Sequence, residues 1–562
     1  MKIVDKLLTN GYENTVLLSY KDNNAIFDNT YTFEDVKRHN IKGVLKANRY
    51  VDGVLTQTYS SDDTHILTIA ATRVGKTTSC VIPQIYSFAA QSVKRSMVIS
   101  DPKGELYRLL ADYLKKQGYD VILLNLRDYA HSEYYNFMTP IYQKYRQAMN
   151  VEKEVGLVKV DGKFRNKFRG VIYEDQAQLD DAIEQIKNLI LSDVEGDIDT
   201  FMYDMIPPDK ADDQYWSEAS RQWGKALILS MLEDSVAKNG VQLIDENNFS
   251  LDTMFKIFDM LTPRNDFDDG GYFSSRGEDS RAYQNSRIVI NNAQKTSACI
   301  VSCFNSKVQA YKSSGIRLMT RCNSFELSRL TSGKPVAVFI AYPDENKVYY
   351  RIISSFIQSA YKHLINFANE KPNGKLDVPF YFMLDEFGNF PKIPDFETVI
   401  SACGGRNIWF DIVLQSFAQL NNVYGKDTAE IIRDNLNMHI FLGSNNPETL
   451  EAFSKECGQT TRISPCSALG GNGKEITRFD LETIALVPKS MLASLKAGEC
   501  VVTEANCGYV FFSKMERYFL CKEYENLVRS SEKDFKSGVN PLDKIYDYRW
   551  IPRSRKSSKF DF

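Results

Sequence analysis

The segment AATRVGKTT, residues 70–78, groups residue types that are suited to binding phosphate. Gly75, Lys76 and Thr77 match the end of the pattern GxxxxGK(S/T), whereas Ala70 stands where that pattern has its first glycine. A short apolar run precedes the segment and a helical pattern follows it, as a phosphate-binding loop requires. In such a loop the backbone N–H groups cradle the phosphates, the lysine reaches the β- and γ-phosphates, and the threonine hydroxyl binds Mg²⁺. The sequence therefore predicts a site for ATP and Mg²⁺ that is formed by Thr72, Arg73, Val74, Gly75, Lys76, Thr77 and Thr78.

Ala70 is a departure from the phosphate-loop pattern that adds one methyl group to the loop's first position. An alanine is tolerated there if its φ is negative, because only a positive φ requires glycine. We therefore expect Ala70 to affect nucleotide affinity more than the fold.

Two adjacent carboxylates end the apolar run VPFYFMLDEF, which covers residues 378–387. A buried parallel strand that ends in acids places them at the carboxyl edge of the sheet, where the phosphates of a bound nucleotide would lie. Asp385 is then expected to hold Mg²⁺, and Glu386 to polarise the attacking water. The alternative is an acidic strand end that is paired with a nearby base.

Two further residues could assist this chemistry. Gln415 ends the next expected strand, IWFDIVLQS, so it could sense the γ-phosphate, or it could be a surface amide in a loop. Arg406 follows two glycines in a loop, and a guanidinium supplied by a neighbouring subunit could neutralise charge in the transition state. A surface arginine without a catalytic role is the alternative for Arg406.

The segment DPKGE, residues 101–105, ends a second expected strand. Its proline stops strand pairing, its glycine opens the next helix, and Glu105 favours the helix dipole from the first turn. One interpretation is a helix start alone. The other places Asp101 and Lys103 beside the nucleotide or a transported polymer, and the sequence leaves both open.

The elements that must position these residues alternate between apolar, strand-like runs and helical patterns. This alternation predicts an α/β fold, a P-loop nucleotide-binding domain with a mostly parallel sheet that is interrupted by an all-α insertion. A hairpin near the sheet edge is expected over residues 499–514. The expected parallel strands lie at residues 65–70, 96–100, 119–126, 335–343, 378–387, 408–416 and 438–444.

Composition shifts divide the chain into five expected segments. They are an N-terminal segment (1–60), the nucleotide-binding domain in two parts (61–200 and 321–515), an all-α insertion (201–320) and a C-terminal extension with a basic tail (516–562).

The composition narrows the class of protein. In 562 residues, 43% are hydrophobic and 25% charged, which excludes a largely disordered chain and a collagen-like repeat. No apolar run approaches the length that spans a bilayer, and the N-terminus lacks the apolar core of a secretory signal. Ten scattered cysteines without paired CxxC motifs argue against a zinc site. A net charge of −3 gives no bulk signal for nucleic acid, although a local basic channel could still bind it.

The last stretch of the chain is strongly basic. RWIPRSRKSSK, residues 549–559, carries five basic residues and no acid. It is either a solvated tail or a contact with DNA, anionic lipid or an acidic partner.

The motifs, in their order, resemble those of the TraG/TraD-like coupling proteins of type IV secretion and conjugation, which belong to the group of RecA-like and FtsK-type P-loop ATPases. The resemblance covers roughly residues 60–515. It rests on the segments TRVGKT, DPKGELY, YYNFM, YWSEASRQW, MLDEFGNFPKI, QSFAQL and LVPKSMLASLKAGECVV.

This resemblance implies that the nucleotide-binding domain is RecA-like. It also implies an ATPase that recruits a relaxase–DNA complex to the transfer channel and drives translocation of single-stranded DNA as a hexameric ring. The family position is cytoplasmic, at the inner face of the bacterial membrane. Most members of the family begin with transmembrane helices, and this chain shows none, so either a separate membrane-anchor subunit is expected or the chain is a soluble type. The all-α insertion resembles the family's membrane-distal domain, which is associated with substrate recognition. By motif position, Gly75, Lys76 and Thr77 bind the nucleotide, and Asp385 and Glu386 act on Mg²⁺ and water. Arg406 and Gln415 fall where the family has an intersubunit arginine and a sensor glutamine.

Two alternative functions stay open. The chain could couple protein effectors instead of DNA, or it could be a nucleotide-gated adaptor that binds relaxase and channel but hydrolyses slowly. Stimulation of ATPase activity by single-stranded DNA would separate them from a DNA pump.

Overall fold

The structure is a computed structural model that forms two compact units, each described by itself. Unit 1 comprises residues 1–127, 327–350 and 360–535, and unit 2 comprises residues 128–326, 351–359 and 536–562. The structure describes residues 16–19, 29–37, 41, 43–151, 157–160, 163–166, 172–173, 175–207, 214–236, 242–262, 267–268, 271–345, 347–469, 475–505, 507 and 509–541.

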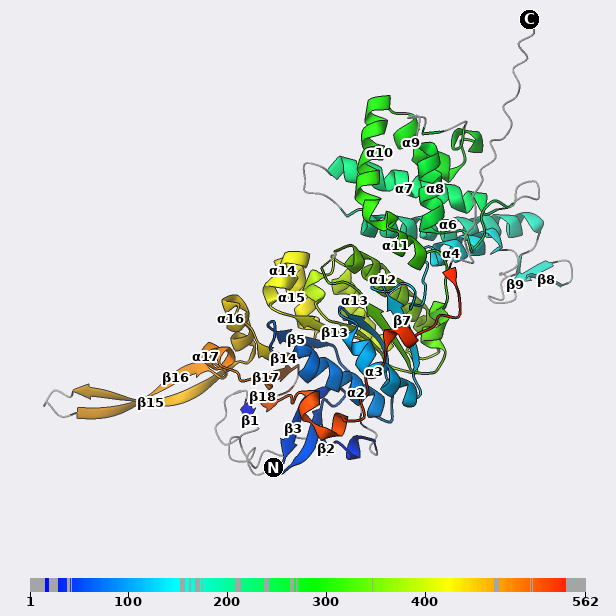
Figure 1. Cartoon of the computed structure of the whole chain (residues 1–562). Helices are drawn as coiled ribbons and strands as arrows, with labels where there is room; N and C mark the ends of the chain where they lie inside the picture. Colours follow the sequence, from blue (N-terminus) through cyan, green and yellow to red (C-terminus); the bar gives the residue numbers. More distant parts are fainter. Residues whose placement is uncertain are drawn as a thin grey trace, which may run out of the picture. The chain divides into compact units, whose positions relative to one another are not determined.

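Unit 1 is built on a ten-stranded sheet in the order β1-β18-β17-β14-β5-β13-β12-β6-β11-β7 (Figure 1). Every neighbouring pair from β14 to β7 is parallel, which confirms the seven parallel strands predicted from the apolar runs. These strands are β5 (Ile66–Ala70), β6 (Ser96–Asp101), β7 (Asp120–Asn125), β11 (Val336–Ala341), β12 (Phe380–Leu384), β13 (Ile408–Leu414) and β14 (Met438–Gly443).

Helices cover both faces of this sheet, which is why its strands read as continuous apolar runs. On one face the ring of Tyr381 in β12 lies 4.5 Å from that of Phe88 in α2 (Ile82–Ala90). On the other face the ring of Phe410 in β13 packs on Phe396 of α13 and Tyr361 of α12. The helices of unit 1 are α2, α3 (Glu105–Lys116), α12 (Lys347–Glu370), α13 (Phe396–Cys403), α14 (Phe417–Tyr424), α15 (Lys426–Asn435), α16 (Pro447–Glu456) and α17 (Lys489–Ala493); residues 351–359 of α12 belong to unit 2.

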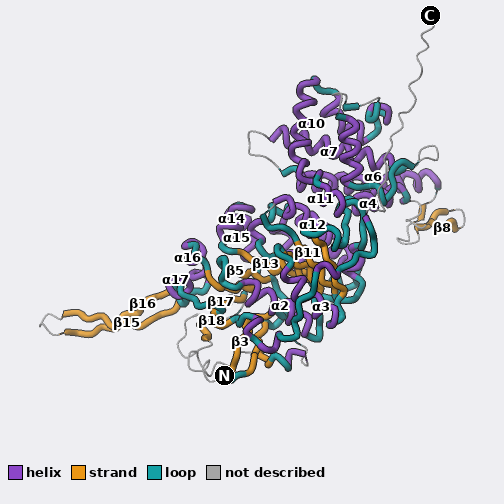
Figure 2. The backbone as a smooth tube through the Cα atoms, viewed as in Figure 1, coloured by secondary structure: helices purple, strands orange, loops and turns teal. Residues whose placement is uncertain are grey.

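The hairpin predicted over residues 499–514 is confirmed at the sheet edge. Strands β17 (Glu499–Glu504) and β18 (Tyr509–Lys514) pair antiparallel, and β1 (Val16–Ser19) adds to β18 in parallel. The expected N-terminal segment also holds a separate three-stranded sheet of β2 (Thr30–Thr32), β4 (Val54–Tyr59) and β3 (Leu45–Val51). A two-stranded antiparallel hairpin pairs β15 (Gln459–Leu469) with β16 (Glu475–Ala485), and Figure 2 shows it as a pair of orange tubes.

Unit 2 is mostly helical, as the purple tubes of Figure 2 show. Its β-structure within the described residues is a small sheet of β8 (Leu157–Val160), β9 (Lys163–Asn166) and β10 (Ile172–Tyr173). Its helices are α4 (Thr139–Met149), α6 (Gln176–Met205), α7 (Gln214–Asp234), α8 (Leu251–Leu261), α9 (Arg281–Ile290), α10 (Gln294–Val308) and α11 (Ser314–Met319).

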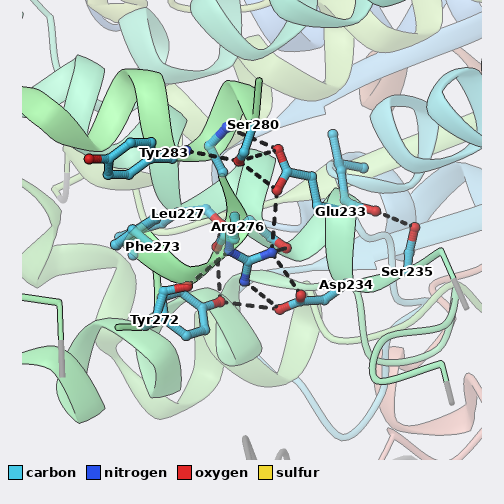
Figure 3. A network of polar contacts seen from close by, with 12 residues as sticks. Leu227, Glu233, Asp234, Ser235, Tyr272, Phe273, Arg276, Ser280 and Tyr283 are labelled. Atoms are coloured by element: carbon cyan, nitrogen blue, oxygen red, sulfur yellow. Dashed lines mark hydrogen bonds and ion pairs between the residues drawn. The ribbon is translucent and has the colours of Figure 1, made fainter. Parts of the chain in front are cut away.

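A buried ion-pair network fastens the start of α9 to the end of α7 (Figure 3). The Arg276 side chain, only 6% exposed, donates to both carboxylate oxygens of Asp234 at 2.8 and 2.9 Å and lies 3.3 Å from Glu233. Glu233 also accepts the hydroxyl of Ser280, which caps the N-terminus of α9. The Arg276 guanidinium stacks over the Tyr272 ring at 4.7 Å. Buried charges are stable only when paired in this way, so the network fixes the loop before α9.

Unit 2 is larger than the insertion expected over residues 201–320. The expected boundary at residue 201 falls inside α6, and the unit begins at residue 128. Helix α6 packs on α7 so closely that a Cβ at Gly224 would lie 2.2 Å from the Met202 side chain. Both helices therefore belong to one helical unit.

Within the described residues, no helix is long and apolar enough to cross a membrane. The basic tail at residues 549–559, and with it most of the expected C-terminal extension beyond residue 541, lies outside the described residues.

Candidate nucleotide-binding site

Three adjacent parallel strands position the predicted site residues. Strand β13 lies between β5 and β12, with Leu414 opposite Ile69 and Ile412 opposite Leu384. Because all three strands run the same way, their carboxyl ends meet at one edge of the sheet. The segments that follow them bring together the phosphate-binding loop, Asp385-Glu386 and Gln415.

The loop after β5 has the backbone of an anion cradle. Arg73 and Gly75 adopt positive φ values of 67° and 106°, and such left-handed residues turn successive N–H groups toward a common point. Arg73 is a non-glycine residue in this region, which is uncommon and often found at functional sites. The following turn, Thr77–Val81, is a π-helical turn that leads into α2. Ser79 N–H donates to the Gly75 carbonyl at 2.8 Å and closes the loop onto the helix.

Ala70 lies in extended backbone as the last residue of β5 and is fully buried. The next residue, Ala71, donates its N–H to the Gly443 carbonyl at the end of β14, at 2.8 Å. The extra methyl group therefore packs in the sheet, and the left-handed turns of the loop come later in the chain.

Lys76 lies between the two carboxylates predicted for Mg²⁺ and water. Its ammonium is 2.9 Å from Asp385 Oδ1 and also contacts Glu386 Oε1. The three side chains are only 16%, 8% and 22% exposed, respectively. Burial disfavours the Lys76 ammonium, but the two carboxylates outweigh burial and raise the pKa of Lys76. Burial raises the pKa of Asp385, and the nearby ammonium opposes only part of that shift.

Glu386 and Gln415 form the other side of the site. Glu386, the second residue after β12, adopts a left-handed φ of 56°, and its carboxylate contacts Lys76. Gln415 Nε2 donates to Glu386 Oε2 at 3.0 Å, and Thr72 Oγ1 of the loop lies 3.4 Å from Gln415 Oε1. Gln415 therefore contacts both the loop and the carboxylate expected to orient water.

The donor atoms at this site suit Mg²⁺ held together with phosphate. Thr77 and Asp385 offer hard oxygen ligands, and Mg²⁺ commonly binds through one or two carboxylates plus substrate phosphates. Within the described residues, no cluster of three or more His, Cys, Asp or Glu side chains could hold a metal by protein ligands alone. The residues thus fit a nucleotide-dependent magnesium site.

Arg406 does not join this group within its own chain. It precedes β13, whereas Gln415 follows the same strand, so the two residues mark opposite edges of the sheet. Its guanidinium contacts Asn369 Oδ1 at 3.2 Å and the Ala402 carbonyl at 3.1 Å.

The sequence and fold comparisons agree with this geometry. Residues 27–478, well over half of the chain, match the profile of the family described as type IV secretory system conjugative DNA transfer. The chain belongs to this family.

Relatives of this family member include two conjugal transfer proteins TraG from Escherichia coli. They are 23% identical over 414 residues, covering 71% of this chain and 56% of that protein, and 22% identical over 426 residues, covering 73% and 58%. The chain thus spans a little over half the length of these relatives.

Solved structures of the conjugative coupling protein TrwB share the fold. A trigonal form with sulphate has a TM-score of 0.57 at 15% identity, covering 89% of this chain and 93% of that chain. A TrwB complex with ADP and Mg²⁺ has a TM-score of 0.56 at 15% identity, covering 90% and 94%.

In this member of the conjugative DNA transfer family, Asp101 starts a helix. Its buried carboxylate accepts the Tyr107 N–H in the first turn of α3, at 2.8 Å. Burial raises the pKa of Asp101 to about 6. Lys103 is exposed, and its carbonyl accepts the Arg108 guanidinium at 3.1 Å. These contacts support the helix-start interpretation of DPKGE.

Sequence reasoning missed Asp411, a buried acid in the middle of β13. Its side chain is close enough to Cys80 in the π-helical turn to help raise the pKa of that thiol, and the charge of Asp385 adds to the effect of burial in raising the pKa of Asp411. Within the described structure its Oδ1 atom has no hydrogen-bond partner. The single acid in the apolar run IWFDIVL was the available signal.

Replacing Asp411 with asparagine is expected to stabilise the protein at high pH. Burial raises the pKa of Asp411 to about 7, above the unfolded value of about 4. The folded state therefore binds the Asp411 proton more tightly than the unfolded state. The free energy of unfolding is unaffected by this group below pH ~4 and falls as the pH rises from there through ~7. Asp411→Asn removes a cost of about 4 kcal/mol at most at pH 8.

The measurement is the melting temperature of both chains between pH 5 and pH 8. The Asp411→Asn chain should lose less stability than the wild type as the pH rises. Asp62→Asn, a change at an exposed aspartate, serves as the control and should follow the wild type. Parallel profiles for wild type and Asp411→Asn would contradict the prediction.

Proposed function

We propose that this protein is a coupling ATPase of conjugation, which recruits a relaxase–DNA complex to a type IV secretion channel and drives its translocation by hydrolysing ATP. The observation that carries this proposal is the grouping of Lys76, Asp385, Glu386 and Gln415 beside an anion-cradling loop. It occurs in a chain of the conjugative DNA transfer family. TrwB, which shares the fold, has been solved with ADP and Mg²⁺ and with an analogue of ATP.

Each residue of the group has a distinct role in this proposal. The loop N–H groups and Lys76 bind the phosphates, so a triphosphate competes with the two carboxylates for the Lys76 ammonium. This exchange frees Asp385 to hold Mg²⁺ with Thr77 and frees Glu386 to orient the attacking water. When bound, Mg²⁺ would neutralise negative charge on the phosphate oxygens. Gln415 connects the loop to Glu386 and thereby senses the γ-phosphate.

The assembly belongs to the same proposal. A homo-oligomeric ring, a hexamer when active, would place Arg406 of one subunit at the site of its neighbour. Its partners would be the relaxosome, single-stranded DNA held through its backbone, the channel and a separate membrane-anchor subunit. The ring would act in the cytoplasm at the inner face of the membrane.

The test is steady-state ATP hydrolysis with and without single-stranded DNA, across a range of protein concentrations. A DNA pump should show turnover that rises more steeply than protein concentration and is stimulated by DNA. Lys76→Ala, which removes the phosphate-binding ammonium, is the matched inactive control.

Other outcomes distinguish the alternatives. Turnover that DNA does not stimulate would favour a coupler for protein effectors. Nucleotide binding without turnover under every condition would favour the nucleotide-gated adaptor and overturn the pump.

A further inference from the structure

The segment that follows β18 crosses unit 1 as a strap, residues 516–535, and packs on helices α2 and α3. The Tyr524 ring lies 4.8 Å from that of Tyr86 in α2. Farther along, Ser530 N–H donates to the Arg108 carbonyl at 2.6 Å, and Glu532 lies 3.3 Å from the Arg108 guanidinium. The strap is therefore anchored to α2, which follows the phosphate-binding loop after β5, and to α3, which follows β6.

Arg517, near the start of the strap, lies beside the phosphate-binding loop. A Cβ atom built on Gly75 would be 3.5 Å from Arg517 Nε and 3.3 Å from Thr78 Oγ1. The Arg517 and Thr78 side chains therefore both border the glycine that lets the loop approach phosphate. The backbone here is fixed, because Glu516 N–H donates to the Asn48 carbonyl at 2.7 Å and Leu520 N–H donates to the Arg517 carbonyl at 2.9 Å.

Among the described residues, the Arg517 guanidinium has no ion pair or hydrogen-bond partner. Lys76, in contrast, is held by two carboxylates. A partly exposed guanidinium next to a loop of N–H donors adds positive potential at that side of the loop. An arginine presents a planar fork of donors that matches phosphate oxygens.

We propose that Arg517 binds the nucleotide phosphates in its own chain, at the side of the loop bordered by Gly75 and Thr78. This inference rests on the proposed nucleotide site and adds a residue that is remote in sequence from all of its motifs. It also gives the strap a function, because the contacts of the strap with α2 and α3 hold the arginine against the loop.

The experiment measures the dissociation constant of a fluorescent ADP analogue for the full chain and four variants. Arg517→Ala and Arg517→Gln should each weaken binding at least about tenfold, as expected for a lost charge-assisted contact. Arg529→Ala, a change at an exposed arginine of the same strap, should bind like the wild type. Lys76→Ala should lose binding and reports on the nucleotide site itself. Melting temperatures measured without nucleotide show whether the wild type and the four variants are equally stable.

The outcomes separate the two ideas. Glutamine keeps part of the side-chain stem but not the charge, so weak binding by Arg517→Ala alone would assign the effect to packing and overturn the inference. Wild-type affinity in both Arg517 variants, with binding lost in Lys76→Ala, would also overturn it and leave the nucleotide site intact. A wild-type chain that binds no ADP would overturn both proposals.

Discussion

Glu386→Gln is expected to lower the rate of ATP hydrolysis by a factor on the order of 10² to 10⁴, while nucleotide binding persists. The change keeps the size of the side chain and an oxygen that can accept the Gln415 amide, but it removes the negative charge that would polarise water. Asp385 still contacts Lys76 in the absence of Glu386. The loss should therefore affect kcat far more than affinity.

Two measurements check this expectation. Steady-state turnover gives kcat, and titration with a fluorescent ATP analogue gives the dissociation constant of the same chain. Glu397→Gln is the matched control, because Glu397 lies in the first turn of α13 and has no contact with Lys76 among the described residues. Near-normal turnover in Glu386→Gln would contradict the role assigned to Glu386, whereas loss of binding would show that the charge mainly holds the empty site together.

The parallel part of the sheet could be predicted because burial on both faces leaves a simple pattern in sequence. Strand β12 is buried at every position, and its run FYFML reads as continuously apolar. The acids after it could be placed at the sheet edge because parallel strands end together. The same argument placed Gln415, which the structure brings to Glu386.

Other parts of the fold left weaker signals. Strand β3 carries the buried polar residues Lys46 and Asn48 inside LKANRYV, so the run has no apolar pattern. Lys46 is stabilised there by an ion pair with Glu504 in β17, a partner that lies far away in sequence. The order of the strands in the sheet also depends on pairing between segments that are far apart in sequence, since β11 lies between β6 and β7.

The sequence motifs also left out residues that lie beside the candidate site, because some of these residues come from distant parts of the chain. Arg517 reaches the loop only because β18 and the strap return to the start of α2. A motif describes residues that are close in sequence. It cannot include a side chain that comes from a segment hundreds of residues later in the chain. Asp411 carried a local signal, a single acid within an apolar strand, and the structure buries it beside Cys80 of the π-helical turn.

Arg406→Ala is expected to reduce hydrolysis by a factor on the order of 10³ or more, if the arginine completes the site of a neighbouring subunit. The position of Arg406 in the fold limits how it could act on the site. Arg406 and Gln415 lie at opposite ends of β13, a strand of seven residues, so more than about 20 Å separates them. Within one chain, Arg406 cannot contact the phosphates that Lys76 binds. Any catalytic effect of Arg406 must therefore act across an interface.

Mixing two inactive variants tests this directly. A chain with Arg406→Ala still offers Glu386, and a chain with Glu386→Gln still offers Arg406, so a mixed ring contains interfaces that have both. Equal amounts should recover up to about a quarter of the wild-type rate if interfaces form at random. Lys426→Ala, a change at an exposed lysine of α15, should leave the rate unchanged, and Arg406→Lys should recover little because the fork of donors is lost. An active Arg406→Ala chain would contradict the role of Arg406, and a mixture without activity would show that Arg406 and Glu386 do not meet across subunits.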